Sequence, residues 1–345
     1  MARLCPVAAA QLSEVAAFLT ERFHPKPADN FVKLDYLRWQ YLDWPPAPGP
    51  RAHSCLEGDN IIAHAGTIYS RFLHPAAEPG AGPVLSNVHS WASSRQAGPA
   101  GAMLLWQSFR HSDVQYAFSF SPQAQRVFAA AGFKFVQVVP TFRRILTATG
   151  RRAAYSREPL AKSVAFRAIE TVLSPWRALP PVSSALALEE VEEFDSNAEQ
   201  VARCASRHCI LSARDSSFLN HILKHPFGMT HGYYLRDGSD LAGLALLHVE
   251  EREGVRYAKI LDCLMISPDR WQYARAVAPL LRQLSALHAD IVIVHAGTPW
   301  LQAALRANNF YNRGRKTLWV RDPKAILPKG YPYHMSLLDS DLAFL

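Results

Sequence analysis

Apolar positions in the first half of the chain predict helices and strands in a mixed order. Positions that recur every three or four residues indicate amphipathic helices, and positions that alternate between turn residues indicate strands. The predicted elements are two helices (7–23 and 34–42), a hairpin (51–56 and 61–73), a strand (84–92), a helix (100–111), a strand (114–120), a helix opened by Ser121-Pro122, and closing strands (133–146). This order is typical of a mixed α/β fold, in which helices cover a sheet.

Residues 150–187 interrupt the pattern and carry four prolines, so they predict a connector with one internal helix at about 160–173. Beyond them the order of predicted elements repeats. Thr298-Pro299 follows Ser121-Pro122 by 177 residues, and Asn309-Phe310 follows Gly132-Phe133 by the same 177. A near-constant offset over several elements indicates a duplication. We therefore predict an N-terminal domain (1–149), a connector (150–187), a C-terminal domain (188–325) and a C-terminal tail (326–345).

The composition favours a globular protein and argues against several classes of function. The chain has 345 residues, of which 49% are hydrophobic and 19% are charged, and this suits two packed domains. The net charge of +8 is scattered, so we expect no nucleic-acid partner. No apolar run is long enough for a membrane span, and the N-terminal stretch is too polar for a signal peptide, so we expect a cytoplasmic protein. The five cysteines lack CxxC spacing, so neither a disulfide framework nor a metal site is expected.

One motif, at residues 95–101, indicates a binding site for an anion. The segment Arg95-Gln96-Ala97-Gly98-Pro99-Ala100-Gly101 lies directly after a predicted strand and opens a predicted helix. Unpaired N–H groups and the positive end of the helix dipole can hold an anion at such a place. Gly98 and Gly101 let the backbone approach a phosphate, and Arg95 can add a charge-assisted bond. We therefore expect this turn to hold a pyrophosphate.

This turn resembles the acyl-CoA-binding signature of the GNAT acyltransferase superfamily, and the helix after Ser121 matches the family at the same intervals (Ser121, Ala124, Phe128 and Gly132-Phe133). The resemblance covers about residues 5–148 and, without the signature, about 190–322. It implies two tandem GNAT-like folds, the second of them degenerate, and acetyl-CoA or another acyl-CoA as the cofactor. In the second half the corresponding segment, 267–272, has no glycine, so we predict one CoA site, in the N-terminal half.

The resemblance also implies where CoA would lie. A β-bulge in strand 84–92 would open the sheet, and the pantetheine arm would lie between this strand and strand 114–120. The implied cofactor-binding residues are Ser90, Trp91, Ala92, Arg95, Gln96, Ala97, Gly98, Pro99, Ala100, Gly101, Ser121, Gln125 and Phe128. Tyr41, with Trp39 and Trp44, would border the acceptor pocket.

The sequence departs from the family at two catalytic positions. Phe128 stands where the family often has a tyrosine that protonates the leaving thiolate, and phenylalanine cannot donate a proton. Strand 84–92 has no carboxylate to serve as the base, and His89 is its only titratable side chain. His89 is therefore the candidate base, and a purely structural histidine is the alternative. Tyr116 is the candidate acid, with a packing role as the alternative.

Two functions stay open at this stage. The first is an N-acetyltransferase that moves an acetyl group from acetyl-CoA to a small-molecule amine, an amino sugar being one option, by direct attack. The second is a tandem-GNAT pseudoenzyme that binds CoA or a partner, which the missing tyrosine and the missing strand carboxylate favour. Residues 37–41 and 339–341 also resemble a subgroup of tandem GNAT proteins found beside polysaccharide genes, so a place in polysaccharide biosynthesis is one option. Either a monomer or a homodimer is compatible with two fused copies.

Overall fold

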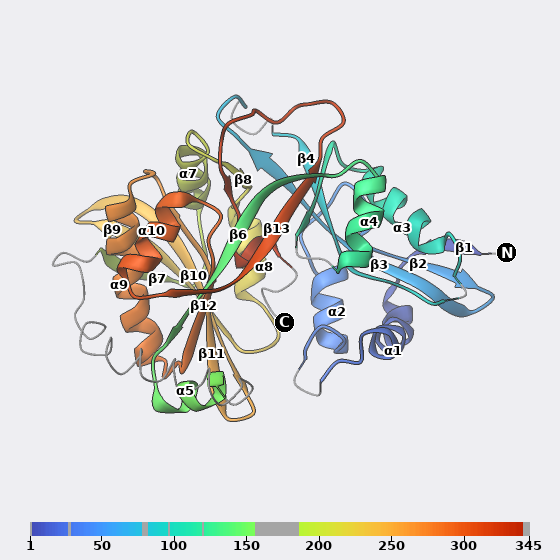
Figure 1. Ribbon diagram of the computed structural model, residues 1–345, viewed down its shortest axis with the longest axis horizontal. Helices are drawn as coiled ribbons and strands as arrows, with labels where there is room; N and C mark the ends of the chain where they lie inside the picture. Colours follow the sequence, from blue (N-terminus) through green and yellow to red (C-terminus); the bar gives the residue numbers. More distant parts are fainter. Residues whose placement is uncertain are drawn as a thin grey trace.

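One mixed sheet runs through both halves of the chain, in the strand order β1-β2-β3-β4-β5-β13-β6-β12-β11-β10-β9-β7 (Figure 1). The computed structural model describes residues 2–26, 29–77, 82–95, 97–118, 121–155 and 186–340. The prediction of a mixed α/β fold is confirmed. The predicted helix at 160–173 lies outside the described residues. Within them, no helix is both long and apolar enough to cross a membrane.

The two halves contain the same elements in the same order. The first repeat has β1 (Arg3–Pro6), α1 (Leu12–Phe23), α2 (Leu34–Tyr41), β2 (Ala52–Glu57), β3 (Asn60–Leu73), β4 (Val84–Ser93), α3 (Ala100–Phe109), β5 (Val114–Phe118), α4 (Pro122–Ala130) and β6 (Lys134–Ile145). The second has β7 (Ala187–Val191), α7 (Ser196–Ala205), α8 (Ser216–Leu223), β9 (Met229–Asp237), β10 (Asp240–Arg252), β11 (Val255–Met265), α9 (Arg270–Ala286), β12 (Ile291–His295), α10 (Pro299–Ala307) and β13 (Tyr311–Arg321). Further elements are α5 (Ala148–Tyr155), β8 (Ile210–Ser212) and β14 (Tyr333–His334).

The last strands of the two repeats are exchanged. Strand β13, from the second repeat, pairs antiparallel with β5 of the first and lies between β5 and β6. Strand β6, from the first repeat, pairs antiparallel with β12 of the second. The two exchanged strands also pair with each other along most of their length. The predicted closing strands of the first half are thus one strand, β6, that joins the sheet of the second half, while the domain boundaries stay predictions.

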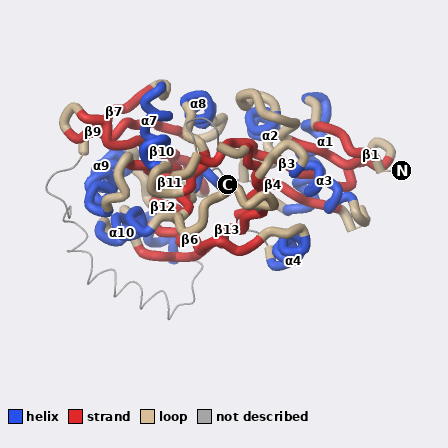
Figure 2. Tube along the Cα trace, turned by 90° about the horizontal axis from the view of Figure 1, so that it is seen from above, coloured by secondary structure: helices blue, strands red, loops and turns tan. Residues whose placement is uncertain are grey.

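Helices of both repeats share one hydrophobic core. Helices α1, α2, α7 and α8 lie on one face of the sheet (Figure 2), and a single cluster contains Leu19 and Leu37 together with Val201 and Leu219. Separate clusters pack α3 and α4 against the first repeat and α9 and α10 against the second, on the other face. Burial of apolar surface therefore holds the two repeats together in addition to the exchanged strands.

The sheet opens between β4 and β5. These parallel strands are paired only from Leu85 to Asn87, although β4 continues to Ser93. Opposite β3, the register shifts by one residue between His89 and Ala92, and Ser90 has a φ of +49°. An extra residue in one strand bends it and ends regular pairing. The predicted bulge in this strand is therefore confirmed.

The second repeat opens in the same way, but its opening is filled by the chain itself. Strands β11 and β12 are paired only as far as Ile260 and Val294, and β11 has a register shift at that point. The N–H of Gly297, just after β12, donates to the carbonyl of Met335 at 2.9 Å. A Cβ on Gly297 would lie 2.3 Å from the carbonyl oxygen of Tyr333, so only glycine allows this approach.

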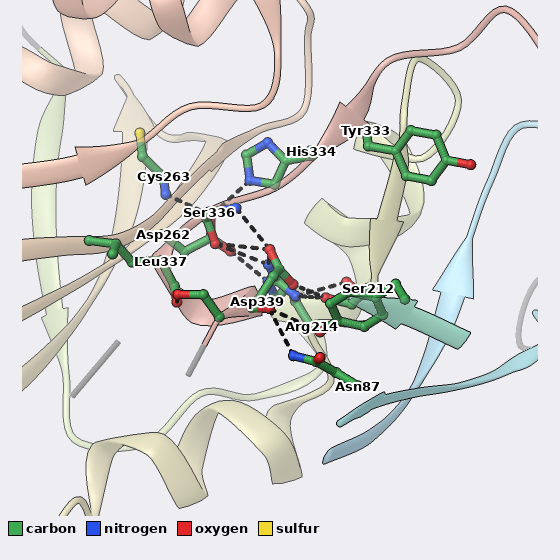
Figure 3. A network of polar contacts seen from close by, with 12 residues as sticks. Asn87, Ser212, Arg214, Asp262, Cys263, Tyr333, His334, Ser336, Leu337 and Asp339 are labelled. Carbon is green, nitrogen blue, oxygen red and sulfur yellow. Dashed lines mark hydrogen bonds and ion pairs between the residues drawn. The ribbon is translucent and has the colours of Figure 1, made fainter. Parts of the chain in front are cut away.

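A buried arginine fixes the C-terminal segment in this place. Arg214 is fully buried, and its Nε and Nη2 lie 2.5 and 2.8 Å from the carboxylates of Asp262 and Asp339 (Figure 3). Its Nη1 donates to the carbonyl of Ser212 at 3.1 Å. His334 donates from Nε2 to Asp262 at 2.8 Å. The network thus joins the end of β8, strand β11 and the C-terminal segment.

In this network the effect of charge pairing on the pKa values of Arg214 and Asp262 outweighs the effect of burial. Burial opposes ionisation of Asp262, but Arg214 and His334 beside it hold the pKa of its carboxyl below the ordinary value. Burial also opposes the charge on Arg214, but Asp339 and Asp262 raise the pKa of the guanidinium above its ordinary value. Arg214 and Asp262 therefore stay charged, and removal of one leaves the other buried without its counter-charge.

We expect Arg214→Met to destabilise the protein by about 3–5 kcal/mol, because two buried carboxylates lose their cation. The matched control is Arg236→Met, which removes a half-exposed ion pair with Glu189 and should cost less than about 1 kcal/mol. Urea unfolding at pH 7 measures both free energies. Equal losses in the two variants would contradict the anchoring role of Arg214.

Candidate functional site

The predicted anion turn has the geometry of an open helix N-terminus. Helix α3 starts at Ala100, and Gly98 precedes it with a φ of +50°, a conformation that glycine adopts without strain. The N–H groups of Gly98, Gly101 and Ala102 donate no hydrogen bond to a described residue. Arg95 is exposed beside them. Three unpaired donors thus meet the positive end of the helix dipole.

Not every residue of the predicted signature contributes to this arrangement. Gln96 lies outside the described residues. The N–H of Ala97 donates to the carbonyl of Ser94 at 3.2 Å, and that of Ala100 donates to Ala97 at 2.9 Å, so both are already used. Pro99 is the N-cap residue and has no N–H.

The predicted pantetheine-contacting residues lie around the opening beside this turn. Ser90 and Ala92 belong to the bulged part of β4. The indole N–H of Trp91 donates to the carbonyl of Gly101 at 3.0 Å, and its ring meets the ring of Phe128 edge-on at 5.6 Å. Trp91 therefore extends from β4 to α4 across the mouth of the opening.

Helix α4 contributes the remaining predicted residues. Ser121 is its N-cap, and its hydroxyl accepts from the N–H of Ala124 at 3.2 Å. Gln125 is exposed in the first turns, whereas Phe128 is buried among the rings of Phe109 and Phe133. Of these three residues, Phe128 contacts the bulged strand through Trp91, and the binding roles of Ser121 and Gln125 stay predictions.

The corresponding place in the second repeat has no free helix N-terminus. Helix α9 is capped by Asp269, whose carboxylate accepts from the N–H of Trp271 at 3.0 Å. A carboxylate at this position takes the donor that an anion would need and adds a like charge. Together with the filled opening, this makes the two repeats unequal.

A buried polar network lies under the bulge, on the face covered by α2. His89 is 4% exposed; its Nδ1 lies 3.2 Å from the hydroxyl of Ser90, and its Nε2 lies 3.3 Å from the amide nitrogen of Gln40. The hydroxyl of Tyr41 lies 3.1 Å from Nε2 of His64. Gly66 makes room for the ring, since a Cβ there would lie 2.3 Å from His89.

Desolvation dominates the electrostatics of this network. Burial lowers the pKa of His89 to about 3, with a further contribution from the positive charge of Arg51. Burial also lowers the pKa of His64 to about 3 and raises that of the Tyr41 hydroxyl. Both histidines are therefore neutral at pH 7. A base with so low a pKa takes up a proton poorly at neutral pH.

Tyr116, the predicted acid, lies at the closed end of the opening. Its side chain is buried, and its hydroxyl donates to the carbonyl of Asp339 at 3.0 Å. The side-chain amide of Asn87, paired with it across β4 and β5, reaches the same carbonyl at 3.5 Å. The acid role of Tyr116 and the base role of His89 stay predictions.

Comparison with solved structures gives matches over nearly the whole chain, whereas no protein-family model and no curated protein matches it. The N-myristoyltransferase of Saccharomyces cerevisiae, solved with myristoyl-CoA and inhibitors, matches at 10% identity over 98% of this chain and 84% of its own, with a TM-score of 0.61. A GCN5-related N-acetyltransferase from Anabaena variabilis matches at 10% identity over 93% of this chain and 72% of its own, with a TM-score of 0.59. Another from Kribbella flavida matches at 11% identity over 93% of this chain and 70% of its own, with a TM-score of 0.55. The chain has the GNAT fold.

Within the GNAT fold of this chain, the sequence did not reveal which polar residues would meet beneath the bulge. Gln40 and Ser54 come from α2 and β2, and Ser54 lies 3.0 Å from Nδ1 of His64. Arg51, just before β2, is buried close enough to affect His89. No spacing along the chain marks these residues, because the sheet and α2 bring them together only in three dimensions. Among the described residues, no group of three or more His, Cys, Asp or Glu could hold a metal ion.

We expect stability to fall as the pH is lowered from 6.5 to 5.5. The unfolded chain protonates its histidines near pH 6.5, whereas folded His64 and His89 stay neutral down to about pH 3. Acid therefore favours the unfolded chain, by about 1 kcal/mol for each such histidine over this interval. Urea midpoints across the interval measure the slope, and His89→Gln should make it shallower. A flat profile in the wild type would contradict the desolvated state of these rings.

Proposed function

We propose that this protein is an acyltransferase that binds one acyl-CoA in its N-terminal repeat and transfers the acyl group to a small-molecule amine. The observation that carries the proposal is the juxtaposition of the open β4–β5 pair with the three unpaired N–H groups at the start of α3. A pyrophosphate is the anion that suits such donors, and the thioester would then lie at the bulge. The GNAT fold and the myristoyl-CoA bound to the yeast N-myristoyltransferase support this cofactor class.

In this proposal the chain acts chiefly by position and by hydrogen bonding. Backbone groups at Ser90 to Ala92 hold and polarise the thioester carbonyl, and the amine attacks it directly. Neutral His89 accepts a hydrogen bond at Nε2 from the amide nitrogen of Gln40, so its Nδ1–H donates to the hydroxyl of Ser90 and holds that side chain at the bulge. The amine proton then leaves to solvent, and the CoA thiolate takes up a proton after the carbon–sulfur bond breaks.

A second candidate function is a non-catalytic module that binds acyl-CoA or a partner. Three observations favour it: Phe128 cannot donate a proton, the pKa of His89 is about 3, and Trp91 contacts Phe128 across the mouth of the opening. The unpaired donors at α3 suit both candidates, so binding and turnover have to be measured separately.

We expect Ala102→Glu to weaken acetyl-CoA binding by about tenfold or more, because a carboxylate in the first turn of α3 occupies the anion's place. The same change stabilises a helix N-terminus by itself, so loss of binding would not reflect unfolding. Gln272→Glu, at the matching position of α9, is the control and should bind like the wild type. Calorimetric titration measures affinity and stoichiometry.

A stoichiometry of two equivalent sites, or equal effects in both variants, would contradict the assignment of one site to the N-terminal repeat.

We expect release of free CoA thiol when acetyl-CoA is mixed with the protein and a small amine that it accepts. The measurement is thiol release over a panel of small amines, with Ala102→Glu as the negative control. Binding of acetyl-CoA without thiol release from any amine would reject the enzyme and support the non-catalytic module.

A further inference from the structure

Two stretches of the chain that contain no acidic residue come together on one face of the sheet. Residues 114–155 hold six arginines and lysines and residues 291–321 hold five, but neither stretch has an aspartate or a glutamate. They include α4, β6, α10 and β13, and β6 and β13 lie between the two helices (Figure 2). The net charge of the whole chain is +8, so the remainder of the chain is acidic on balance. The positive charge is therefore concentrated on these elements.

Large apolar side chains are exposed on the same face. Trp106 of α3 is 51% exposed, and Phe135 and Val138 of β6 are 52% and 40% exposed. The register places Phe135 opposite Trp319 of β13. It places Val138 opposite Thr317, two residues before Trp319 and thus on the same side of β13. Trp319 packs against the hydrophobic cluster that α3 and α4 cover, so these side chains of β6 point to the side of those helices.

Arg321 of β13 connects these apolar side chains. Its guanidinium lies 5.5 Å from the ring centre of Trp106, and its Nε donates to the carbonyl of Ala131, at the end of α4, at 3.0 Å. Two residues earlier on β13, the ring of Trp319 meets the ring of Phe135 edge-on at 6.3 Å. The end of α3, the end of α4 and the two exchanged strands thus share one surface.

This surface, here called the aromatic-basic patch, also carries exposed cations. It consists of Trp106, Arg110, Lys134, Phe135, Val138 and Arg321. Acidic residues flank it only along the chain, before β5 and after β13. Asp113 pairs with Lys324 at 3.3 Å, and the carboxylate of Asp322 accepts from the N–H groups of the loop that follows it. The positive charge of the patch therefore faces solvent without acidic side chains among its members.

The patch is separate from the anion turn. Helix α3 starts at Ala100, beside the turn, whereas Trp106 and Arg110 lie at its other end. At a rise of about 1.5 Å per residue, Trp106 is about 9 Å and Arg110 about 15 Å further along the helix axis. A phosphate held at the turn therefore does not account for the cations of the patch.

Exposed cations beside aromatic and aliphatic side chains suit an anionic lipid surface. Headgroup phosphates attract lysine and arginine, and tryptophan and phenylalanine favour the boundary between headgroups and acyl chains. A second copy of this chain fits less well, because a two-fold contact through the patch would place like charges opposite each other. Nucleic acid also fits less well, since Val138 offers nothing to a phosphate backbone and Arg321 already covers one face of the Trp106 ring.

We propose that the aromatic-basic patch binds the surface of an anionic membrane. Trp106 and Phe135 would enter the headgroup boundary, and Arg110 and Lys134 would lie at the lipid phosphates. The contact is peripheral and involves side chains of elements that are already folded. It does not depend on the acyl transfer proposed above, so each can be rejected without the other.

The test is sedimentation of the protein with vesicles made of equal parts of phosphatidylglycerol and phosphatidylcholine. Vesicles of phosphatidylcholine alone are the neutral control. We expect binding to the anionic vesicles to be at least about tenfold tighter, because the cations of the patch contribute only where the surface is negative. Equal binding to both kinds of vesicle, or binding to neither, would overturn the proposal.

A pair of charge reversals locates the contact. Lys134→Glu should weaken binding to the anionic vesicles by about tenfold or more, because it removes one attraction and adds one repulsion. Lys224→Glu changes the net charge by the same amount at an exposed position of α8, on the opposite face of the sheet, and should weaken binding less than about twofold. Equal losses in both variants would show attraction by the net charge alone and reject the patch.

A pair of tryptophan variants tests the apolar part of the contact. Trp106→Ser should weaken binding to the anionic vesicles by about fivefold or more, and Phe135→Ser should do the same. Trp271→Ser is the matched control, since Trp271 is 59% exposed on α9 and has Arg270 over its ring at 5.0 Å, but lies outside the patch. All these side chains are half-exposed, so the urea midpoints should stay close to the wild-type value.

The remaining outcomes also decide the matter. If Trp106→Ser and Phe135→Ser both bind the anionic vesicles like the wild type, no side chain enters the lipid and the proposal is wrong. If the wild type instead binds a mixed-sequence duplex through Lys134 and leaves anionic vesicles in solution, the patch is a nucleic-acid surface and the membrane is rejected.

Discussion

A guanidinium that is fully withdrawn from water needs acceptors on every side, and Arg214 finds them on three separate parts of the chain. Its own backbone lies between β8 and α8, and its partners come from β11 and from the segment that carries Ser336 and Asp339. This requirement sets the position of the C-terminal segment at the centre of the sheet. Through the carbonyl of Asp339, the same segment then meets Asn87 and Tyr116 at the closed end of the first opening.

The two repeats share an architecture, but they differ in whether the gap in the sheet and the helix N-terminus beside it are open. Each has a bulged strand that leaves its parallel neighbour, yet only the first leaves a helix N-terminus with free donors beside the gap. In the second, Asp269 caps the helix and residues near Met335 fill the gap. Duplication followed by such specialisation explains how the first copy keeps an open gap while the second supplies the exchanged strand β13.

The polar groups beneath the bulge are arranged for hydrogen bonding more than for proton transfer. Burial keeps His64 and His89 neutral and keeps the Tyr41 hydroxyl protonated, so the network has a fixed state over the neutral range.

The sequence predicts more about the fold than about the candidate site. Periodic apolar positions and their near-constant offsets were sufficient for the mixed α/β fold and the repeat, because these depend on residues close together along the chain. The bulged strand was implied only by the family resemblance. The exchange of β6 and β13 was not predictable, since alternation shows that a segment is a strand but not which strand it pairs with. Gln40 and His89 meet for the same reason only after folding, and so do Tyr41 and His64. The sequence alone determined the elements and the place of the anion turn, and the tertiary structure decided which polar groups are buried together and which opening stays free, because burial and pairing are properties of distant segments in contact.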